Sequence, residues 1–259
     1  MSIVKPVLIT LLFISGSVSI GNAFNASVDT QQVVEQRNDS IEIQKTLSVK
    51  NKSQIQWLNR FENEMKAFRE KDASVTDFRC DVLFVGSSSI RLWPELSQSM
   101  SPLKVVNRGY GGATLCDLFF NYNTVFSAYR PKAIVFYCDN DICGWKEGDL
   151  TVEEVFDLYR AFLNQVHENY PQIPIYFLSI KHSLSRKSLR EKQHILNVLM
   201  EEFAGLTPYL TYVDVCTPLL DEKGNVRNEL FQNDNLHLNK DGYARWVKVL
   251  KPILLEQCK

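Results

Sequence analysis

Five short apolar runs recur along the chain, and the segments between them have a different hydrophobic pattern. The runs lack alternation of polar and apolar residues, and they span 82–85, 103–106, 133–137, 173–180 and 210–213. Helix-like patterns occupy 152–169 and 189–203 between them, and 241–256 after the last run and a long loop. Unbroken apolar strands interleaved with helices are typical of a parallel sheet that is covered on both faces. The pattern therefore predicts an α/β fold with a five-stranded parallel sheet.

The ordered part of the chain is expected to begin with an amphipathic helix. Apolar residues recur at steps of three and four over this stretch, namely Ile55, Leu58, Phe61, Met65 and Phe68. This spacing places them on one face of a helix that packs against the core. No internal repeat or low-complexity linker follows, so residues 54–259 are predicted to form one domain.

The first 53 residues are expected to lie outside that domain. Residues 1–23 combine one lysine, an apolar run of about 14 residues, and small residues at Gly21 and Ala23. These features predict a secretory signal peptide that is cleaved after Ala23, because the run is short for a membrane span. The protein is then exported without a stable membrane span, and an uncleaved N-terminal anchor is the alternative. Residues 24–53 are polar and predict a poorly ordered leader.

The charge of the chain bears on its partners, and its cysteines bear on disulfide bonds and metal sites. The net charge of -1 and the lack of a basic stripe give no support for a nucleic-acid partner, so a small molecule or a glycan is favoured. The six cysteines are an even number in an exported chain and allow 15 complete pairings, among which the sequence does not choose. Several of them could equally be buried thiols. Their spacings match no zinc site, and no cofactor is predicted.

Three consecutive serines, Ser87, Ser88 and Ser89, follow the first apolar run. The carboxyl ends of the strands of an open parallel sheet face the ligand crevice, so a serine at this point can reach a substrate. A hydroxyl is a weak nucleophile unless a base lies within hydrogen-bonding distance and a further group orients that base. The alternative is that glycine and serine merely form a loop here.

Only one of the four histidines has the context of a catalytic base. His237 follows the fifth strand, and Asp234 stands three residues before it, close enough for its carboxylate to reach the imidazole Nδ1. The alternative is a helix-capping loop, in which Asn239 or Asp241 is the N-cap and His237 is incidental. The other histidines fit less well: His167 and His194 are expected on helix surfaces, whereas His182 follows the fourth strand and could line the crevice.

Donors for a developing oxyanion are also present after two strands. Three glycines, Gly109, Gly111 and Gly112, leave backbone N–H groups accessible after the second strand. Asn140 follows the third strand, where its side-chain amide could donate. One such donor is worth about 3 to 4 kcal/mol in acyl transfer.

Four segments in this order resemble the conserved blocks of the SGNH, or GDSL-type, hydrolases. They read V-L-F-V-G-S-S-S-I-R-L-W, N-R-G-Y-G-G-A-T, Y-C-D-N-D-I and D-N-L-H-L-N-K-D-G-Y, and they lie between residues 81 and 250. The resemblance implies a three-layer α/β/α sandwich of the flavodoxin-like type, with esterase, lipase-like or carbohydrate-deacetylating activity and no metal. It assigns the nucleophile to Ser88, the base to His237 with Asp234 as its orienting group, and the oxyanion hole to Ser88, Gly112 and Asn140, with Gly111 as the alternative to Gly112.

Two positions depart from the family pattern. Ser87 replaces the usual aspartate before the nucleophile, and Cys138 replaces a glycine, which could change the direction of Asn140.

The leading hypothesis is an exported serine esterase that forms an acyl-enzyme. The alternatives are an acyltransferase that acts on a glycan, or a glycan-binding protein without turnover. Aromatic residues near the crevice could shape a pocket or belong to the core: Tyr110, Phe119, Phe120, Tyr137 and Trp145.

Overall fold

The computed structural model describes residues 59–126, 129–142 and 150–259. The predicted signal peptide and leader, together with Cys143 and Trp145, lie outside these residues. None of the helices in the described ranges is both long enough and apolar enough to span a lipid bilayer.

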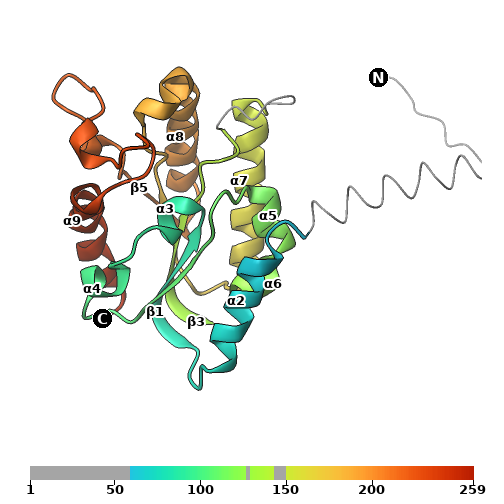
Figure 1. Cartoon of the computed structure of the whole chain (residues 1–259). Helices are drawn as coiled ribbons and strands as arrows, with labels where there is room; N and C mark the ends of the chain where they lie inside the picture. Colours follow the sequence, from blue (N-terminus) through green and yellow to red (C-terminus); the bar gives the residue numbers. More distant parts are fainter. Residues whose placement is uncertain (1–58, 127–128, 143–149) are drawn as a thin grey trace, which may run out of the picture. The chain divides into compact units, whose positions relative to one another are not determined.

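Five parallel strands form one sheet, as the apolar runs predict (Figure 1). Their order across the sheet is β2-β1-β3-β4-β5. The strands are β1 (Arg79–Gly86), β2 (Val105–Gly109), β3 (Arg130–Tyr137), β4 (Ile175–Leu178) and β5 (Leu210–Val213). Residues 82–85 of β1 are fully buried, because this strand has neighbours on both sides and helices over both faces. The predicted fold class, α/β with a five-stranded parallel sheet, is confirmed.

Backbone pairing rather than apolarity decides where the strands end. The second strand was predicted over 103–106, but β2 begins at Val105, which pairs with Val82, and it runs on to Gly109. Its last three residues, Asn107, Arg108 and Gly109, extend the ladder although none of them is apolar. A parallel ladder needs only main-chain groups, so the hydrophobic pattern located the centre of the strand and missed its end.

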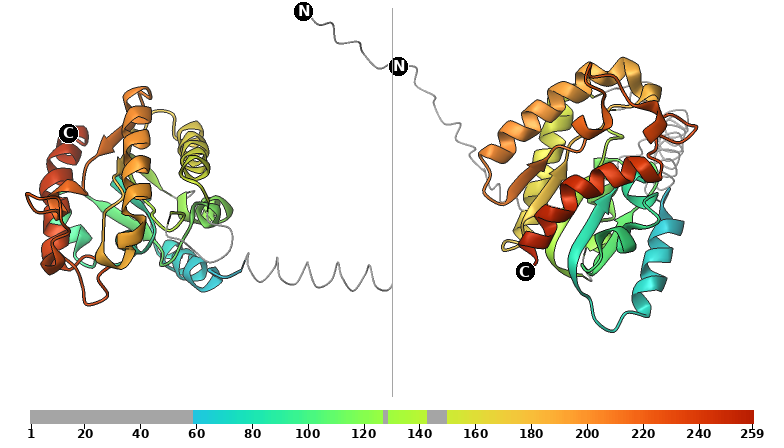
Figure 2. Two further views of the ribbon diagram at one scale, coloured as in Figure 1. Left: turned by 90° about the horizontal axis from the view of Figure 1, so that it is seen from above. Right: turned by 90° about the vertical axis from the view of Figure 1, so that its left-hand side faces the viewer.

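The helices divide between the two faces of the sheet. The chain steps from β1 to β2 in one direction and from β2 to β3, β4 and β5 in the other, and right-handed crossovers place these connections on opposite faces. One face carries α3 (Ser88–Arg91), α4 (Leu96–Met100) and α9 (Lys240–Gln257). The other carries α5 (Leu115–Phe120), α6 (Tyr122–Phe126), α7 (Val152–Asn169) and α8 (Arg190–Gly205). The right-hand view of Figure 2 looks onto the face that α9 covers. Short 3₁₀ helices, η1 (Leu184–Leu189), η2 (Thr217–Leu219) and η3 (Asn228–Leu230), complete the connections.

The expected amphipathic helix is present as α2 (Glu62–Ala73). Asn59–Phe61 forms a turn before it, and Ile55 and Leu58 of the predicted stretch lie outside the described residues. Arg108 of β2 is buried and pairs with Asp72 of α2, and Phe68 lies edge-on to the ring of Tyr110. The helix is therefore fixed to the edge of the sheet by an ion pair and by the apolar side chains that the pattern identified, Phe61, Met65 and Phe68.

The end of β1 lies unusually close to β3. Gly86 has a φ of +149°, and a Cβ atom built on it would lie 1.7 Å from the carbonyl oxygen of Tyr137. The next residue, Ser87, donates its N–H to the same carbonyl at 3.0 Å. Only glycine allows this approach, and the approach determines where the three serines leave the sheet.

Replacing Gly86 is predicted to destabilise the fold. In Gly86→Ala, the new methyl group overlaps backbone that cannot move without breaking the ladder, so we expect a loss of about 3 kcal/mol or more. Chemical denaturation measures this change in the free energy of unfolding. The matched control is Gly205→Ala at the end of α8, where a Cβ would meet nothing within 4 Å. That variant should be neutral or slightly more stable, and equal losses in the two variants would contradict the explanation.

Candidate active site

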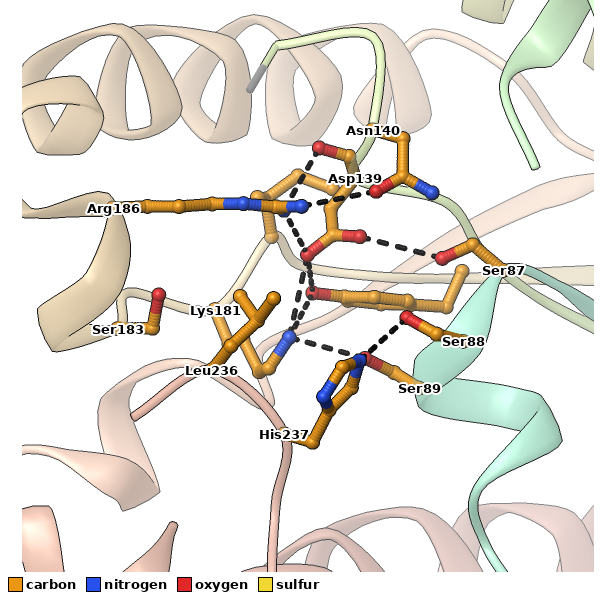
Figure 3. A network of polar contacts seen from close by, with 12 residues as sticks. Ser87, Ser88, Ser89, Asp139, Asn140, Lys181, Ser183, Arg186, Leu236 and His237 are labelled. Carbon is orange, nitrogen blue, oxygen red and sulfur yellow. Dashed lines mark hydrogen bonds and ion pairs between the residues drawn. The ribbon is translucent and has the colours of Figure 1, made fainter. Parts of the chain in front are cut away.

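The three serines differ in their exposure to solvent. Ser87 and Ser89 are buried, with exposed fractions of 0% and 1%, whereas Ser88 is partly exposed. The hydroxyl of Ser87 donates to Asp139, and the hydroxyl of Ser89 accepts from Lys181. Ser88 begins the short helix α3, with its side chain turned toward the loop after η3 (Figure 3). Of the three hydroxyls, that of Ser88 is the one open to a substrate.

A tight loop before α9 brings Asp234 and His237 together. Asn235 adopts a positive φ of 56°, a conformation that asparagine tolerates better than most residues. The carboxylate of Asp234 accepts the backbone N–H groups of Leu236 and His237, each at 2.9 Å. Its second oxygen lies 2.6 Å from Nδ1 of His237. The loop thus holds the carboxylate and the imidazole in one fixed relation.

The imidazole completes a continuous polar chain to the first turn of α3. Nε2 of His237 lies 2.9 Å from Oγ of Ser88, although the two residues are 149 positions apart. With Nδ1–H donating to the carboxylate, Nε2 is left to accept the serine proton. Burial raises the pKa of Asp234, but hydrogen bonds from the side chain and backbone of His237 outweigh this effect and hold the pKa at about 2. The carboxylate is therefore ionised at neutral pH.

The helix-capping interaction that the sequence predicts as an alternative for this loop is also present. Asn239 is the N-cap of α9, and its side-chain oxygen accepts from the N–H groups of Asp241 and Gly242. The capping interaction begins two residues after His237, so it leaves the imidazole in its contact with Ser88. Capping and the Asp234–His237–Ser88 contact are compatible functions of one loop.

The turn after β2 contains the glycine to which the resemblance assigns an oxyanion role. Gly112 has a φ of +77°, a left-handed conformation that glycine adopts without strain, and a Cβ there would meet nothing within 4 Å. Within the described ranges, the N–H groups of Gly112 and Ser88 donate to no acceptor. At Ser88 this follows from its place as the first residue of a helix, where N–H groups have no partner within the helix.

Asn140 is buried and held from two sides. Its Nδ2 donates to the carbonyl of Ala113 at 2.7 Å, and its Oδ1 accepts from Arg186 at 2.9 Å. The thiol of Cys138 also donates to the carbonyl of Ala113, at 3.2 Å, and burial raises the pKa of that thiol. The side chain of Cys138 thus bonds the same carbonyl as Asn140, and both side chains connect the segment after β3 to the turn after β2.

A second link joins the same two segments. The carboxylate of Asp141 accepts the N–H of Leu115, the first residue of α5, with its two oxygens at 3.1 and 3.0 Å. Burial raises the pKa of this carboxyl to about 6 despite that hydrogen bond. The segment after β3 is therefore fixed to the start of α5 as well as to Ala113.

A buried array of charges beside the serines was not predicted from the sequence. Asp139 is buried and interacts with Lys181 and Arg186 as well as with the hydroxyls of Tyr137 and Ser87 (Figure 3). Lys181 and Arg186 both follow β4, at the same edge of the sheet as the other polar residues. Their position after a strand is the signal that could have identified them, although only His182 of that segment was predicted to line the crevice.

The other histidines and the described aromatic residues named from the sequence take no part in the contacts between Ser88, His237 and Asp234. His182 is buried in the wall of a cavity of about 780 Å³ between α8 and η2, and the described lining of that cavity contains none of Ser88, Asp234 and His237. His194 is exposed, and His167 stacks on Tyr209 with ring centres 3.8 Å apart. Tyr110 and Tyr137 belong to the core, Phe119 is partly buried against it, and Phe120 is exposed.

The described part of the chain contains neither a disulfide bond nor a cluster of metal-ligating side chains. Its five cysteines are free thiols, namely Cys80, Cys116, Cys138, Cys216 and Cys258, and all but Cys116 are buried. In the same ranges, no group of three or more His, Cys, Asp or Glu side chains is placed to hold a metal ion.

Comparison with known proteins identifies the family of the chain. Residues 74–245 match the model of the GDSL-like Lipase/Acylhydrolase family, which is about two thirds of the chain. The chain belongs to this family. As a member of the GDSL-like lipases and acylhydrolases, the protein is an ester-hydrolysing enzyme. A comparison with curated protein sequences finds no match.

Several solved structures share the fold. A protein from Streptococcus pneumonia that is described as a candidate platelet activating factor is 24% identical, with 80% of this chain and 99% of that chain covered and a TM-score of 0.66. A GDSL-like lipase from Bacteroides thetaiotaomicron VPI-5482 is 16% identical over 74% and 97% of the two chains, with a TM-score of 0.61. A variant of an acetyl xylan esterase from Geobacillus stearothermophilus is 18% identical over 69% and 94%, with a TM-score of 0.53. At these identities, the likeness establishes the fold of this GDSL-like chain.

Replacing Asp234 by asparagine is predicted to remove most of the esterase activity. The introduced amide would donate to Nδ1, so the imidazole would carry its proton on Nε2 and could not accept one from Ser88. We expect kcat to fall by roughly 10³- to 10⁴-fold. Steady-state kinetics with an activated ester measure the loss, and Asp157→Asn, which alters an exposed carboxylate on α7, is the control. A small loss in Asp234→Asn would exclude this role.

Proposed function

We propose that the protein is an exported serine esterase that removes a small acyl group, such as acetyl, from a sugar, glycan or lipid through an acyl-enzyme. The observation that carries the proposal is the contact of 2.9 Å between Oγ of Ser88 and Nε2 of His237, continued by the contact of 2.6 Å between Nδ1 and Asp234. A partly exposed serine, an imidazole and an ionised carboxylate in this order are the elements of nucleophilic acyl transfer.

In the first half of the reaction, Oγ of Ser88 attacks the ester carbonyl carbon while Nε2 of His237 takes the hydroxyl proton. The carbonyl oxygen becomes an oxyanion, and Asp234 stabilises the imidazolium by accepting its Nδ1–H. When the tetrahedral intermediate collapses, the bond to the alcohol oxygen breaks and His237 returns the proton to that oxygen. The alcohol leaves, and Ser88 carries the acyl group.

In the second half, a water molecule replaces the alcohol. His237 takes a proton from the water, the resulting hydroxide attacks the acyl carbon, and the proton returns to Oγ of Ser88 as the acid leaves. The oxyanion in both halves would accept from the N–H groups of Ser88 and Gly112 and from the amide of Asn140. Within the described ranges, the backbone N–H groups of Ser88 and Gly112 donate to no acceptor, and this supports their role as oxyanion donors.

The proposal for the acyl group and the alcohol comes from a structure that shares the fold. One of the solved structures that share this fold is named as an acetyl xylan esterase, which favours a short acyl group on a carbohydrate. An acceptor hydroxyl from a sugar could also replace water in the second half. Such transfer would use the same residues, so product analysis with an acceptor sugar present would distinguish transfer from hydrolysis.

Export is proposed from the sequence of the first 23 residues, which have the charge, apolar length and small residues of a signal peptide. A substrate in the periplasm or outside the cell would then be available to the mature enzyme.

Loss of the Ser88 hydroxyl is predicted to abolish hydrolysis. A panel of esters from acetyl to long-chain acyl, together with acetylated sugars, should be hydrolysed by the wild type with a preference for acetyl. Ser88→Ala should lose at least about 10³-fold in kcat, because no nucleophile remains. The matched control is Ser97→Ala, which alters an exposed serine on α4. Unchanged hydrolysis in Ser88→Ala would exclude the proposed nucleophile, and faster turnover of long chains would exclude the proposed acyl class.

Removal of the signal peptide is predicted to leave Phe24 as the first residue. Expression of the full chain in a bacterial host, followed by fractionation and mass spectrometry of the N-terminus, measures both location and cleavage. An Ala23→Leu variant should block cleavage after that residue, because the small side chain at the site is lost. Recovery of the intact chain in the cytosol would contradict export.

A further inference from the structure

The buried array around Asp139 connects the turn of the nucleophile to the segment that carries Asn140. Asp139 Oδ1 accepts from the hydroxyl of Ser87 at 3.3 Å, and Oδ2 lies 3.3 Å from Nζ of Lys181. Nζ of Lys181 also lies 3.0 Å from Oγ of Ser89. The two residues that flank Ser88 are thus held by the same buried ion pair, and neither Asp139 nor Lys181 is exposed by more than 2%.

Arg186 extends this array to the oxyanion amide. Its NH1 lies 2.7 Å from Asp139 Oδ2 and donates to the Asp139 carbonyl at 3.1 Å, while its NH2 donates to Oδ1 of Asn140 at 2.9 Å. One guanidinium therefore spans a carboxylate, a backbone carbonyl and a side-chain amide (Figure 3). A planar group with several donors in fixed directions is suited to this bridging, whereas a lysine ammonium is not.

Two of the contacts of Asn140 within the described residues decide which way its amide faces. Arg186 can only donate, so the amide must present its oxygen to the guanidinium. The carbonyl of Ala113 can only accept, so the amide must present its nitrogen on the other side, as Figure 3 shows. In the reversed orientation, two donors would face each other on one side and two acceptors on the other, and both hydrogen bonds would be lost.

We propose that Arg186 is a positioning residue for the oxyanion hole, which acts by fixing the amide of Asn140 with Nδ2, rather than Oδ1, on the side of the substrate carbonyl. This inference rests on the proposed function, in which Asn140 donates to the oxyanion. Arg186 then contributes to kcat through Asn140 and makes no contact with the substrate. An unfixed amide would spend part of its time with oxygen toward the oxyanion, where it would repel the developing charge.

A double-mutant cycle between Arg186 and Asn140 tests the proposal. Arg186→Gln alone should lower kcat for an acetyl ester by roughly 10- to 100-fold with little change in KM, because the transition state loses an aligned donor. In the Asn140→Ala background, the same substitution should cost less than about threefold, since the amide that it orients is gone. The rate at which a fluorophosphonate labels Ser88 should follow the same pattern, because its phosphoryl oxygen occupies the oxyanion position.

Two further variants separate positioning from general support of the fold. Arg186→Lys keeps a positive charge for Asp139 but cannot span all three acceptors, so kcat should stay low while the midpoint of thermal unfolding stays near that of the wild type. In Arg186→Ala, added methylguanidine should restore part of kcat, and it should restore nothing when Asn140→Ala is also present. Arg190→Gln, an exposed arginine of the adjacent helix that donates to the carbonyl of Gly224, is the control and should keep full activity.

The outcomes distinguish the two proposals. Equal losses from Arg186→Gln in the two backgrounds, or full kcat in Arg186→Lys, would overturn the positioning role while leaving the esterase assignment in place. A wild type without Ser88-dependent hydrolysis or labelling would overturn the proposed function, and the positioning role with it.

Discussion

At the carboxyl end of the sheet, the backbone of Gly86 lies against the carbonyl of Tyr137, and this contact sets the positions of Ser88 and Asn140 relative to each other. It brings the end of β1 next to the end of β3, so that Ser88 leaves the sheet beside Asn140. These two strands flank the point where the strand order reverses, which is where open α/β sheets form their ligand crevices. The loop before α9 then delivers His237 to the same place.

The buried charges of Asp139, Lys181 and Arg186 lie beside the serines and hold the same two segments together. Asp139 would be costly to bury alone, but Lys181, Arg186 and the hydroxyls of Tyr137 and Ser87 satisfy it. Burial raises its pKa, but Lys181, Arg186 and the Tyr137 hydroxyl outweigh this effect and keep the pKa well below the usual range. The array also gives a reason for the serine at position 87. Its hydroxyl lies 3.3 Å from Asp139, so an aspartate at position 87 would put a second carboxylate against the first.

Cys138 has a similar explanation. A side chain in place of glycine was expected to put the direction of Asn140 in doubt, and the structure accommodates it by using the thiol as a donor to Ala113. That carbonyl is also the acceptor for Asn140, so both side chains hold the turn that contains Gly112 against the segment after β3. The hydrogen bonds from the thiol and the amide to one carbonyl make this substitution compatible with an ordered site.

The sequence by itself determined the fold class and the residues that could perform the chemistry. Unbroken apolar runs are a local property, and so are the spacing of Asp234 from His237 and the glycines before Ala113. The end of β2, the different exposure of Ser87, Ser88 and Ser89, and the array joining Asp139 to Lys181 and Arg186 were decided only in the tertiary structure. These features arise from backbone pairing and from contacts between segments that are far apart in the chain, and no local pattern of residues encodes such distances.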